Sequence, residues 1–401
     1  MKKKSVVLAY SGGLDTSFCV KYLSVEKNLE VHTILVNTGG FSDEELADVG
    51  KRSQQMGAVS HKTVSVIDEY YQKCIRFLVY GNILKNHTYP LSVSAERVFQ
   101  AMTIAETALD MNADYIAHGS TGAGNDQIRF DMIFAIMAPG IPILTPIRDQ
   151  KLSREEEIVY LEKNGVKMDW KKAVYSINQG LRGTSVGVNE TLTSDKTLPE
   201  EAYPSQVTKN DETEMQLYFE QGQIKGINGK KYKNPVDAIE ALNKIGSTYG
   251  IGRGVHVGDT IIGIKGRVGF EAAAPMLILK AHEALEKHVL TKWQIYWKEQ
   301  MANWYGMLLH EGQYLEPVMR NIEAFLEDTQ ETVNGTVIIK LAPRRFEIIG
   351  IESENDLMNS KFGQYGEMPS NWTSDDARGF AKIMANQVSI FRKVNNGKKK
   401  S

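Results

Sequence analysis

The sequence predicts an α/β domain built on a parallel sheet, then an α+β domain, and last a C-terminal helix. First, residues 5–165 alternate short apolar runs with amphipathic segments, as strands that alternate with helices do. Second, this alternation then stops, and residues 174–204 are rich in Gly, Ser, Thr and Asn. Third, residues 377–395 carry a stripe of apolar side chains at helical spacing. We therefore expect three parts, at residues 1–167, 168–365 and 366–401.

In the first part, five apolar runs are predicted to be strands, and they lie at residues 5–9, 31–36, 62–66, 115–117 and 143–145. The helices are predicted at residues 16–26, 42–56, 67–80, 95–111 and 153–164. Two of them begin with a capping box, formed by Ser42 with Glu45 and by Ser153 with Glu156. A parallel sheet of this kind binds ligands at the carboxyl ends of its strands.

The second part is predicted to mix strands and helices. Residues 174–204 are expected to be a ligand-facing loop region because they are small and polar. Residues 255–270 carry β-branched residues punctuated by glycines, and a hairpin is expected from residues 336–341 and 345–351. Helices are expected at residues 235–245 and 274–305, and the C-terminal helix at residues 377–395.

Composition indicates an ordinary globular protein with no membrane span. Hydrophobic residues make up 42% and charged residues 24% of the 401-residue chain, a length typical of two to three domains. The formal charge of −2 argues against a dedicated nucleic-acid binder. Cys19 and Cys74 form no CxxC pair, and we expect both to be buried in a protein of a reducing compartment. The expected location is the cytoplasm.

The segment after the first strand points to a nucleotide. A buried strand ends in Ser11-Gly12-Gly13, and a helix follows. Paired glycines let backbone N–H groups approach an anion, and a helix N-terminus adds partial positive charge. Asp15 adds negative charge to this loop, which makes sense if the bound group is a pyrophosphate that carries Mg²⁺. The pattern resembles the pyrophosphate loop of the ATP pyrophosphatase (PP-loop) superfamily, and implies a fold like that of the adenine nucleotide α-hydrolases.

A second glycine-rich loop follows the fourth predicted strand. It reads from His118 to Phe130 and contains Thr121, Asn125 and Asp126. A hydroxyl and an amide can bind the carboxylate of an α-amino acid, and a carboxylate can bind its ammonium. The sequence therefore predicts a site for an amino acid beside the nucleotide.

The two loops together resemble the argininosuccinate synthase family. The likeness continues in Tyr89-Pro90-Leu91, in Ser176 and Ser185, and in the segment from Trp372 to Phe380. It implies that ATP activates the ureido oxygen of citrulline as an adenylate, and that the amine of L-aspartate then displaces AMP. It also implies a homotetramer in which C-terminal helices wrap neighbouring subunits.

The resemblance assigns site residues by position. ATP would be bound by Ala9, Tyr10, Ser11, Gly12, Gly13, Leu14, Asp15, Thr16, Ser17, Val36 and Gly119, with Asp15 near Mg²⁺. Aspartate would be bound by Thr121, Asn125 and Asp126. Citrulline would be bound by Tyr89, Ser94, Arg129, Ser176 and Ser185.

The sequence departs from the family pattern at the citrulline end. A Glu that meets the citrulline ammonium in the family falls on Gly258, and a Tyr falls on Phe270. These two positions are therefore predicted to set specificity. Two interpretations stay open: the substrate is an Nα-acylated citrulline, or it is citrulline itself, with Asp259 replacing the Glu. For an acyl carboxylate, the candidate partners are Arg182, Arg253 and Arg267.

Other functions compete with this one. Another PP-loop ATP pyrophosphatase would share the first loop, and so would a nucleotide-binding module without turnover. The cluster of Thr121, Asn125 and Asp126 argues against the module, which needs no amino-acid site. His118 is a candidate base, although a lone His at a strand end is more often structural. The group that accepts the proton of the aspartate amine stays unassigned.

Overall fold

The computed structural model describes residues 3–166, 168, 176–187, 189–359, 365–367 and 371–396, without the side chains of Ser176 and Asn189. The chain forms two compact units, Met1–Glu354 and Asn355–Ser401. The first unit begins with a five-stranded sheet in the order β3-β2-β1-β4-β5, and every neighbouring pair in it is parallel. Its strands are β1 (Ser5–Ala9), β2 (Glu30–Asn37), β3 (Ser60–Ser65), β4 (Tyr115–Ala117) and β5 (Ile143–Leu144). The predicted parallel α/β domain is confirmed.

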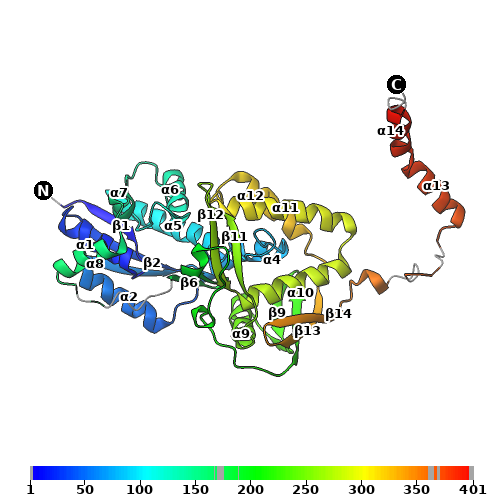
Figure 1. Ribbon diagram of the computed structural model, residues 1–401, viewed down its shortest axis with the longest axis horizontal. Helices are drawn as coiled ribbons and strands as arrows, with labels where there is room; N and C mark the ends of the chain where they lie inside the picture. Colours follow the sequence, from blue (N-terminus) through cyan, green and yellow to red (C-terminus); the bar gives the residue numbers. More distant parts are fainter. Residues whose placement is uncertain are drawn as a thin grey trace. The chain divides into compact units, whose positions relative to one another are not determined.

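Helices cover both faces of this sheet (Figure 1). They are α1 (Leu14–Val25), α2 (Asp43–Met56), α5 (Ser92–Asp110), α6 (Asp126–Met137), α7 (Pro146–Gln150) and α8 (Arg154–Lys163). Alternate side chains of a strand point to opposite faces. Accordingly, Val6 and Leu8 belong to one buried cluster with Phe18 of α1, whereas Val7 belongs to another with Val98 of α5.

The strand order creates a switch point between β1 and β4. The chain leaves β1 toward β2 on one side of the sheet, and β4 lies on the other side of β1. Ligands of open α/β sheets bind in the crevice beyond the strand ends at such a point. Both glycine-rich loops follow these two strands, so the topology brings them together.

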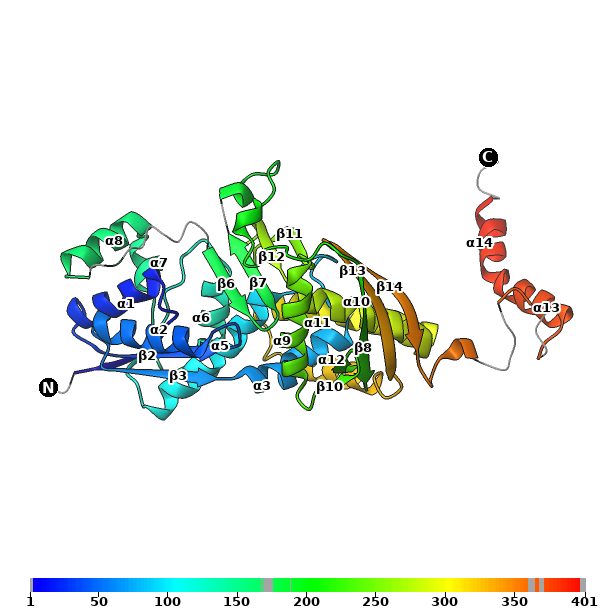
Figure 2. The same ribbon diagram turned by 90° about the horizontal axis from the view of Figure 1, so that it is seen from below.

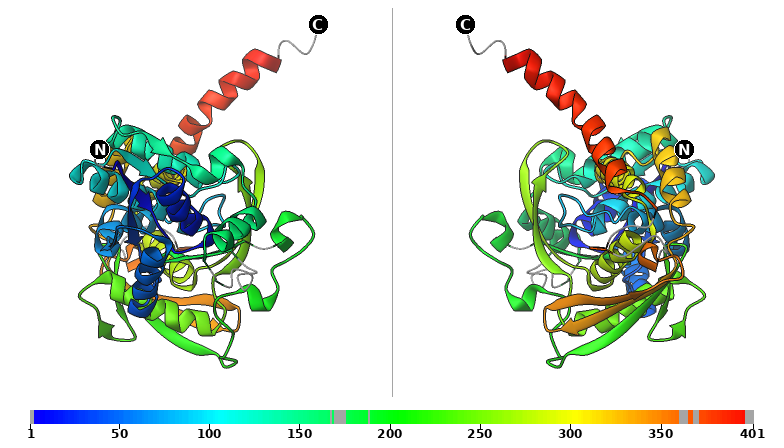
Figure 3. Two further views of the ribbon diagram at one scale, coloured as in Figure 1. Left: turned by 90° about the vertical axis from the view of Figure 1, so that its left-hand side faces the viewer. Right: turned by 90° about the vertical axis from the view of Figure 1, so that its right-hand side faces the viewer.

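The rest of the first unit contains two antiparallel sheets, one in the order β10-β9-β8-β13-β14 and one in the order β11-β12-β7-β6. In Figure 2, the hairpin β6–β7 lies beside β11 and β12, and in Figure 3 the orange hairpin β13–β14 lies beside green strands of its sheet. The strands are β6 (Ser176–Gly180), β7 (Gly183–Gly187), β8 (Thr213–Glu220), β9 (Gln223–Ile227), β10 (Lys230–Lys231), β11 (Arg253–Asp259), β12 (Lys265–Glu271), β13 (Gly335–Ala342) and β14 (Arg345–Glu352).

Helices complete both units. In the first unit they are α3 (Ile67–Tyr70), a π-helical turn (Tyr71–Ile75), α4 (Arg76–Tyr80), α9 (Pro235–Thr248), α10 (Ala273–Val289), α11 (Lys292–His310), α12 (Pro317–Asp328), and short 3₁₀ turns at Asn189–Leu192 and Glu200–Ala202. The second unit contains a 3₁₀ turn (Leu357–Asn359), α13 (Ser374–Met384) and α14 (Asn386–Asn396). None of the helices in the described part of the chain is long and apolar enough to cross a membrane.

Three of the predicted segments differ from the structure. The region 174–204, expected to be loop, contains the hairpin β6–β7. The helix expected at 274–305 is broken, because Thr291 and Gln294 form a capping box that starts α11. The helix expected at 377–395 is two helices, α13 and α14. The sequence analysis also did not predict the strands β8, β9 and β10 or the helix α12.

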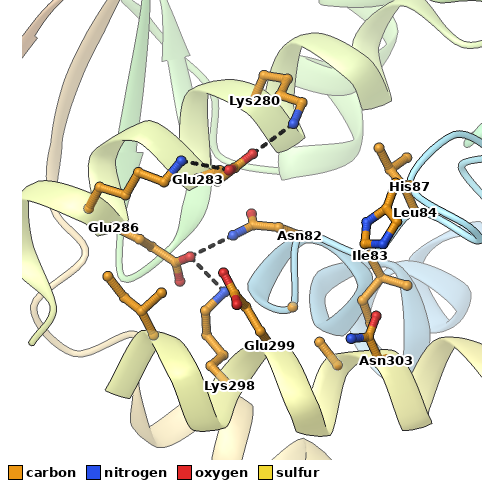
Figure 4. A pocket seen from close by; sticks show the side chains of 14 residues that line it. Asn82, Ile83, Leu84, His87, Lys280, Glu283, Glu286, Lys298, Glu299 and Asn303 are labelled. Atoms are coloured by element: carbon orange, nitrogen blue, oxygen red, sulfur yellow. Dashed lines mark hydrogen bonds and ion pairs between the residues drawn. The ribbon is translucent and has the colours of Figure 1, made fainter. Parts of the chain in front are cut away.

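A buried polar cluster joins α10, α11 and the end of α4. The Glu286 carboxylate accepts hydrogen bonds from Asn82 (2.6 Å) and Gln330 (3.0 Å) and pairs with the Lys298 ammonium at 2.6 Å. The Lys298 ammonium also donates to the Tyr80 carbonyl at 2.8 Å. Asn82, Glu286 and Lys298 line a cavity of about 240 Å³ together with paired surface charges (Figure 4). None of the predicted site residues lines this cavity, so we assign the cluster a structural role.

Replacing Lys298 tests that role. Lys298→Met leaves the buried Glu286 carboxylate without its cation, and we expect the free energy of unfolding to fall by about 3–5 kcal/mol. Lys287→Met is the matched control, because Lys287 pairs with Glu283 at the surface and its loss costs about 0–1 kcal/mol. Urea denaturation followed by tryptophan fluorescence measures both variants, and equal midpoints would contradict the assignment.

Candidate functional site

The first glycine-rich loop presents an open helix N-terminus. Gly13 precedes α1, and no side chain caps this helix, so the N–H groups of its first turn are free of side-chain partners. Gly12 has φ +77°, and a Cβ there would lie 3.0 Å from Val49 Cγ2, so the turn requires glycine. The Arg52 guanidinium donates to the Gly12 carbonyl. Ser11 and Thr16 place their hydroxyls 3.3 Å apart at the mouth of the loop. This geometry suits a phosphate group.

The second loop lies against the first. A Cβ on Gly119 would lie 3.2 Å from Thr16 Cγ2, so the two loops pack directly on each other. Gln127 donates to the Gly122 carbonyl at 2.6 Å and shapes the loop. His118 is buried and bonded to Asp131, with Nε2 2.9 Å from Oδ1, and it accepts from the Ser120 N–H. This arrangement favours the structural interpretation of His118 over a catalytic one.

Asp126 connects the second loop to the rest of the site. Its carboxylate accepts from Arg97 Nε at 2.9 Å and from Arg129 Nη1 at 2.8 Å. Burial favours the protonated acid, but the two arginines outweigh it and lower the pKa of Asp126. Arg97 also donates to Asn178 of β6 at 2.8 Å, and Arg129 donates to the His310 carbonyl. The Asp126 carboxylate therefore binds one arginine from α5 and one from α6. Through these arginines it is connected to β6 and to the end of α11.

Next to this group lies a buried carboxyl that the sequence analysis missed. Glu96 of α5 is 2% exposed, and its Oε1 has no hydrogen-bond partner in the described part of the chain. Burial raises the pKa of Glu96 to about 8 against the opposing effect of Arg97. A Cβ on Gly180 would overlap this carboxyl at 1.6 Å, so β6 needs glycine at that point.

Three hydroxyls form a hub in the predicted citrulline region. The Tyr89 and Ser185 oxygens lie 2.8 Å apart, and Ser92 lies 3.0 Å from the first and 2.9 Å from the second. The Ser94 hydroxyl is buried, without a partner among the described residues. Ser176 begins β6, and its side chain lies outside the described residues.

Of the two predicted specificity positions, one contacts Tyr89 directly and the other contacts it through His256. Phe270 is opposite Ser185 in the β7–β12 pair, and its ring meets Tyr89 edge-on at 5.7 Å. A Cβ on Gly258 would lie 2.5 Å from His256 Nε2. The His256 ring stacks on Tyr89 at 5.2 Å. The imidazole therefore occupies the space that a side chain at position 258 would enter.

Asp15 faces a second carboxylate. Burial raises the pKa of Asp15, and burial together with the Asp15 charge raises the pKa of Glu157 to about 8. Glu157 of α8 is 2% exposed, and its Oε2 has no partner among the described residues. Two carboxylates, one with a free buried oxygen, suit a divalent cation.

The three arginines proposed for an acyl carboxylate are engaged elsewhere. Arg182 is buried and donates to the Pro90 and Ile83 carbonyls. Arg253 pairs with Glu271 and Glu200, and Arg267 donates to the Glu190 and Lys196 carbonyls. Asp259, the candidate to replace the family Glu, pairs with Lys265 at the surface. Cys19 and Cys74 are buried and unpaired, as expected.

Comparison with known proteins finds similarity to one family over nearly the whole chain. The family model described as Arginosuccinate synthase N-terminal HUP domain matches residues 5–167, and that described as Arginosuccinate synthase C-terminal domain matches residues 175–391. An argininosuccinate synthase of Dictyoglomus thermophilum is 35% identical over 98% of both chains. Those of Methanocaldococcus jannaschii and Xanthomonas campestris are also 35% identical, over 91% and 98% of this chain and 92% and 100% of their own.

The carboxylate pair predicts a pH effect on stability. A pKa of about 8 for Glu157 in the folded chain, against an ordinary value of 4.5, means that its contribution is complete below pH 4.5 and lost as the pH rises through 8. We therefore expect Glu157→Gln to melt about 2–4 °C above the wild type at pH 9, and less so at pH 5.

Thermal melting of the protein without ATP or Mg²⁺ measures this difference. Glu155→Gln, an exposed neighbour on α8, is the control. A Glu157→Gln shift of the same size at both pH values would contradict the pairing.

Proposed function

The chain belongs to the argininosuccinate synthase family, and we propose that it joins citrulline and L-aspartate to form argininosuccinate, at the expense of ATP, with release of AMP and pyrophosphate. The observation that carries this function is the contact between two glycine-rich loops at the β1/β4 switch point. One loop suits a phosphate, and the other carries an amino-acid site. The reaction belongs to arginine biosynthesis.

We propose that ATP lies across the first loop, bound by Ala9 to Ser17, Val36 and Gly119. The open N-terminus of α1 would stabilise the departing pyrophosphate, because its N–H groups and dipole face negative charge. The reaction needs no covalent intermediate with the protein. Bringing the ureido oxygen in line with the α-phosphorus supplies much of the rate enhancement.

We propose that Thr121, Asn125 and Asp126 bind aspartate, and that Tyr89, Ser94, Arg129, Ser176 and Ser185 bind citrulline. The contacts of Asp126 with Arg97 and Arg129 support this assignment, because Asp126 belongs to the proposed aspartate site and Arg129 to the proposed citrulline site. They also bring two cations to a site that must accept carboxylates. Gly258 and Phe270 are proposed specificity positions, since Phe270 packs against Tyr89 and Gly258 lies against His256, whose ring stacks on Tyr89.

A divalent cation fits the carboxylates beside the first loop. We propose that Mg²⁺ is held by Asp15 with Glu157, whose free Oε2 and mutual repulsion with Asp15 support a cation there. When bound, Mg²⁺ neutralises charge on the pyrophosphate. The chain's own part is to hold the buried Glu157 carboxylate beside the half-buried Asp15 carboxylate.

We propose that the chain acts as a homotetramer in the cytoplasm, with the division into residues 1–167, 168–365 and 366–401 expected from the sequence. Two exposed apolar faces support self-association. On α11, Trp293, Trp297 and Trp304 are 62%, 53% and 62% exposed. The second group lies on α13 and α14 and contains Phe380, Ile383, Met384, Val388 and Phe391. The unpaired cysteines support a reducing compartment, and cell fractionation tests it.

The activity is tested by pyrophosphate release from the purified protein. We expect release with ATP, Mg²⁺, citrulline and aspartate, and loss of release when Mg²⁺ is removed. Thr121→Ala should raise the KM for aspartate about tenfold, the loss of one hydrogen bond to a carboxylate. Thr121 is exposed, so the fold should survive.

Thr213→Ala, at another exposed threonine, is the control for this variant. The two variants should have the same KM for citrulline, whereas only Thr121→Ala should change that for aspartate. Release that needs no aspartate or citrulline would instead indicate another PP-loop pyrophosphatase.

The tetramer is tested by light scattering after size exclusion. We expect a mass near four times 44.9 kDa. Trp304→Arg should yield smaller species, because a buried arginine without a partner opposes association. Leu192→Arg, at an exposed apolar residue outside α11, α13 and α14, should leave the mass unchanged. A wild-type mass of a single chain would refute the tetramer.

A further inference from the structure

Three basic side chains that the proposed function leaves unused gather around Tyr89. His256 stacks on its ring at 5.2 Å. Lys85 pairs with Tyr89 through both backbone hydrogen bonds, of 2.7 and 3.0 Å. His310 lies against Arg129, whose guanidinium donates two hydrogen bonds to its carbonyl, at 3.0 and 2.7 Å. Three separate segments thus bring basic groups to one end of the proposed citrulline site.

Two of these side chains hold buried nitrogen atoms that lack partners. His256 is 6% and His310 is 9% exposed. His256 Nδ1 and His310 Nε2 make no hydrogen bond within the part of the chain that the structure describes. An unpaired buried polar atom costs about 1–3 kcal/mol. His256 contributes to the lowered pKa of His310, so the two rings are neighbours, and their unpaired nitrogens indicate a missing partner. A ligand that carries oxygen atoms would satisfy both.

The surrounding charge decides which ligand fits. The Lys85 ammonium contacts the Met307 sulfur at 3.2 Å, and no carboxylate of the described residues pairs with it. Asp126, the carboxylate beside Arg129, is already shared by two arginines. Burial and then Lys85 lower the pKa of His256, and burial, Arg129 and Lys85 lower that of His310 to about 3. An ammonium group would be repelled here, whereas a carboxylate would be attracted.

We propose that Lys85, His256 and His310 form a subsite that binds a carboxylate at the α end of the ureido substrate. The proposal rests on the proposed function, because it assumes that a citrulline-like molecule lies against Tyr89. The carboxylate has two possible sources. One is the α-carboxylate of citrulline, and the other is the terminal carboxylate of a dicarboxylic acyl group on its α-nitrogen. Each neutral imidazole can donate one hydrogen bond to it.

Binding measured by titration calorimetry tests the subsite without depending on turnover. The ligands are citrulline, citrullinamide, Nα-acetylcitrulline and Nα-succinylcitrulline. The ligands form two pairs that differ in one carboxylate, citrulline with citrullinamide and succinylcitrulline with acetylcitrulline. In the pair whose carboxylate occupies the subsite, we expect Lys85→Gln to weaken binding of the ligand that carries this carboxylate about 10- to 100-fold, as for a hydrogen bond to a charged group. His256→Phe keeps the ring on Tyr89 and should weaken it about 2- to 10-fold. Lys209→Gln, at an exposed lysine, is the control.

The ligand pairs identify the source of the carboxylate. A Lys85→Gln effect on citrulline but not on citrullinamide assigns the α-carboxylate to the subsite. An effect on succinylcitrulline but not on acetylcitrulline assigns the acyl carboxylate. Lys85→Gln that binds all four ligands as tightly as Lys209→Gln overturns the subsite, and so does a wild type that binds none. A wild type that binds but releases no pyrophosphate refutes the proposed function alone.

Discussion

The shared carboxylate of Asp126 is the contact on which the candidate site depends. It pairs with Arg97 of α5 and Arg129 of α6, and these arginines extend to Asn178 of β6 and to the His310 carbonyl at the end of α11. Four elements from distant parts of the sequence are thereby fixed to one loop. Removing the carboxylate would leave the buried Arg129 without its ion pair and Arg97 with only Glu96, at 4.0 Å, which costs far more than a surface ion pair is worth. The same contact orients the second loop relative to α5 and α6.

The sequence was most informative where local pattern and chemistry coincide. The strand at Ser5–Ala9, the glycines after it and the helix that starts at Leu14 form one continuous segment, so their structure follows from short-range rules. The capping boxes at Ser42 and Ser153 also form as predicted. The alternation of strands and helices was enough to predict the parallel sheet, because few chain topologies are compatible with that alternation. The individual site residues on these loops were assigned by the resemblance to the family and stay predictions.

The rest of the site could not be predicted, because it is assembled by tertiary contacts. His256 and His310 lie 54 residues apart by their numbers and carry no motif, yet both reach the surroundings of Tyr89 and Arg129. The hairpin β6–β7 contains small polar residues that resemble a loop, and it is sheet because β6 pairs with β7 and β7 pairs with β12. The sequence analysis offered Arg182 as a partner for an acyl carboxylate. In the structure its guanidinium donates hydrogen bonds to backbone carbonyls instead.

The electrostatics of the site divide along its length. At the first loop, burial raises the pKa of Asp15, and burial together with the Asp15 charge raises that of Glu157, so this end favours a bound cation. At the Tyr89 end, burial and Lys85 lower the pKa of His256, and burial, Arg129 and Lys85 lower that of His310, so this end attracts an anion. A substrate with a neutral ureido group at one end and carboxylate at the other can satisfy only one orientation in such a field. Orientation is most of what the reaction requires, because positioning the ureido oxygen in line with the α-phosphorus supplies much of the rate enhancement. The charge distribution therefore favours the substrate orientation that the reaction requires.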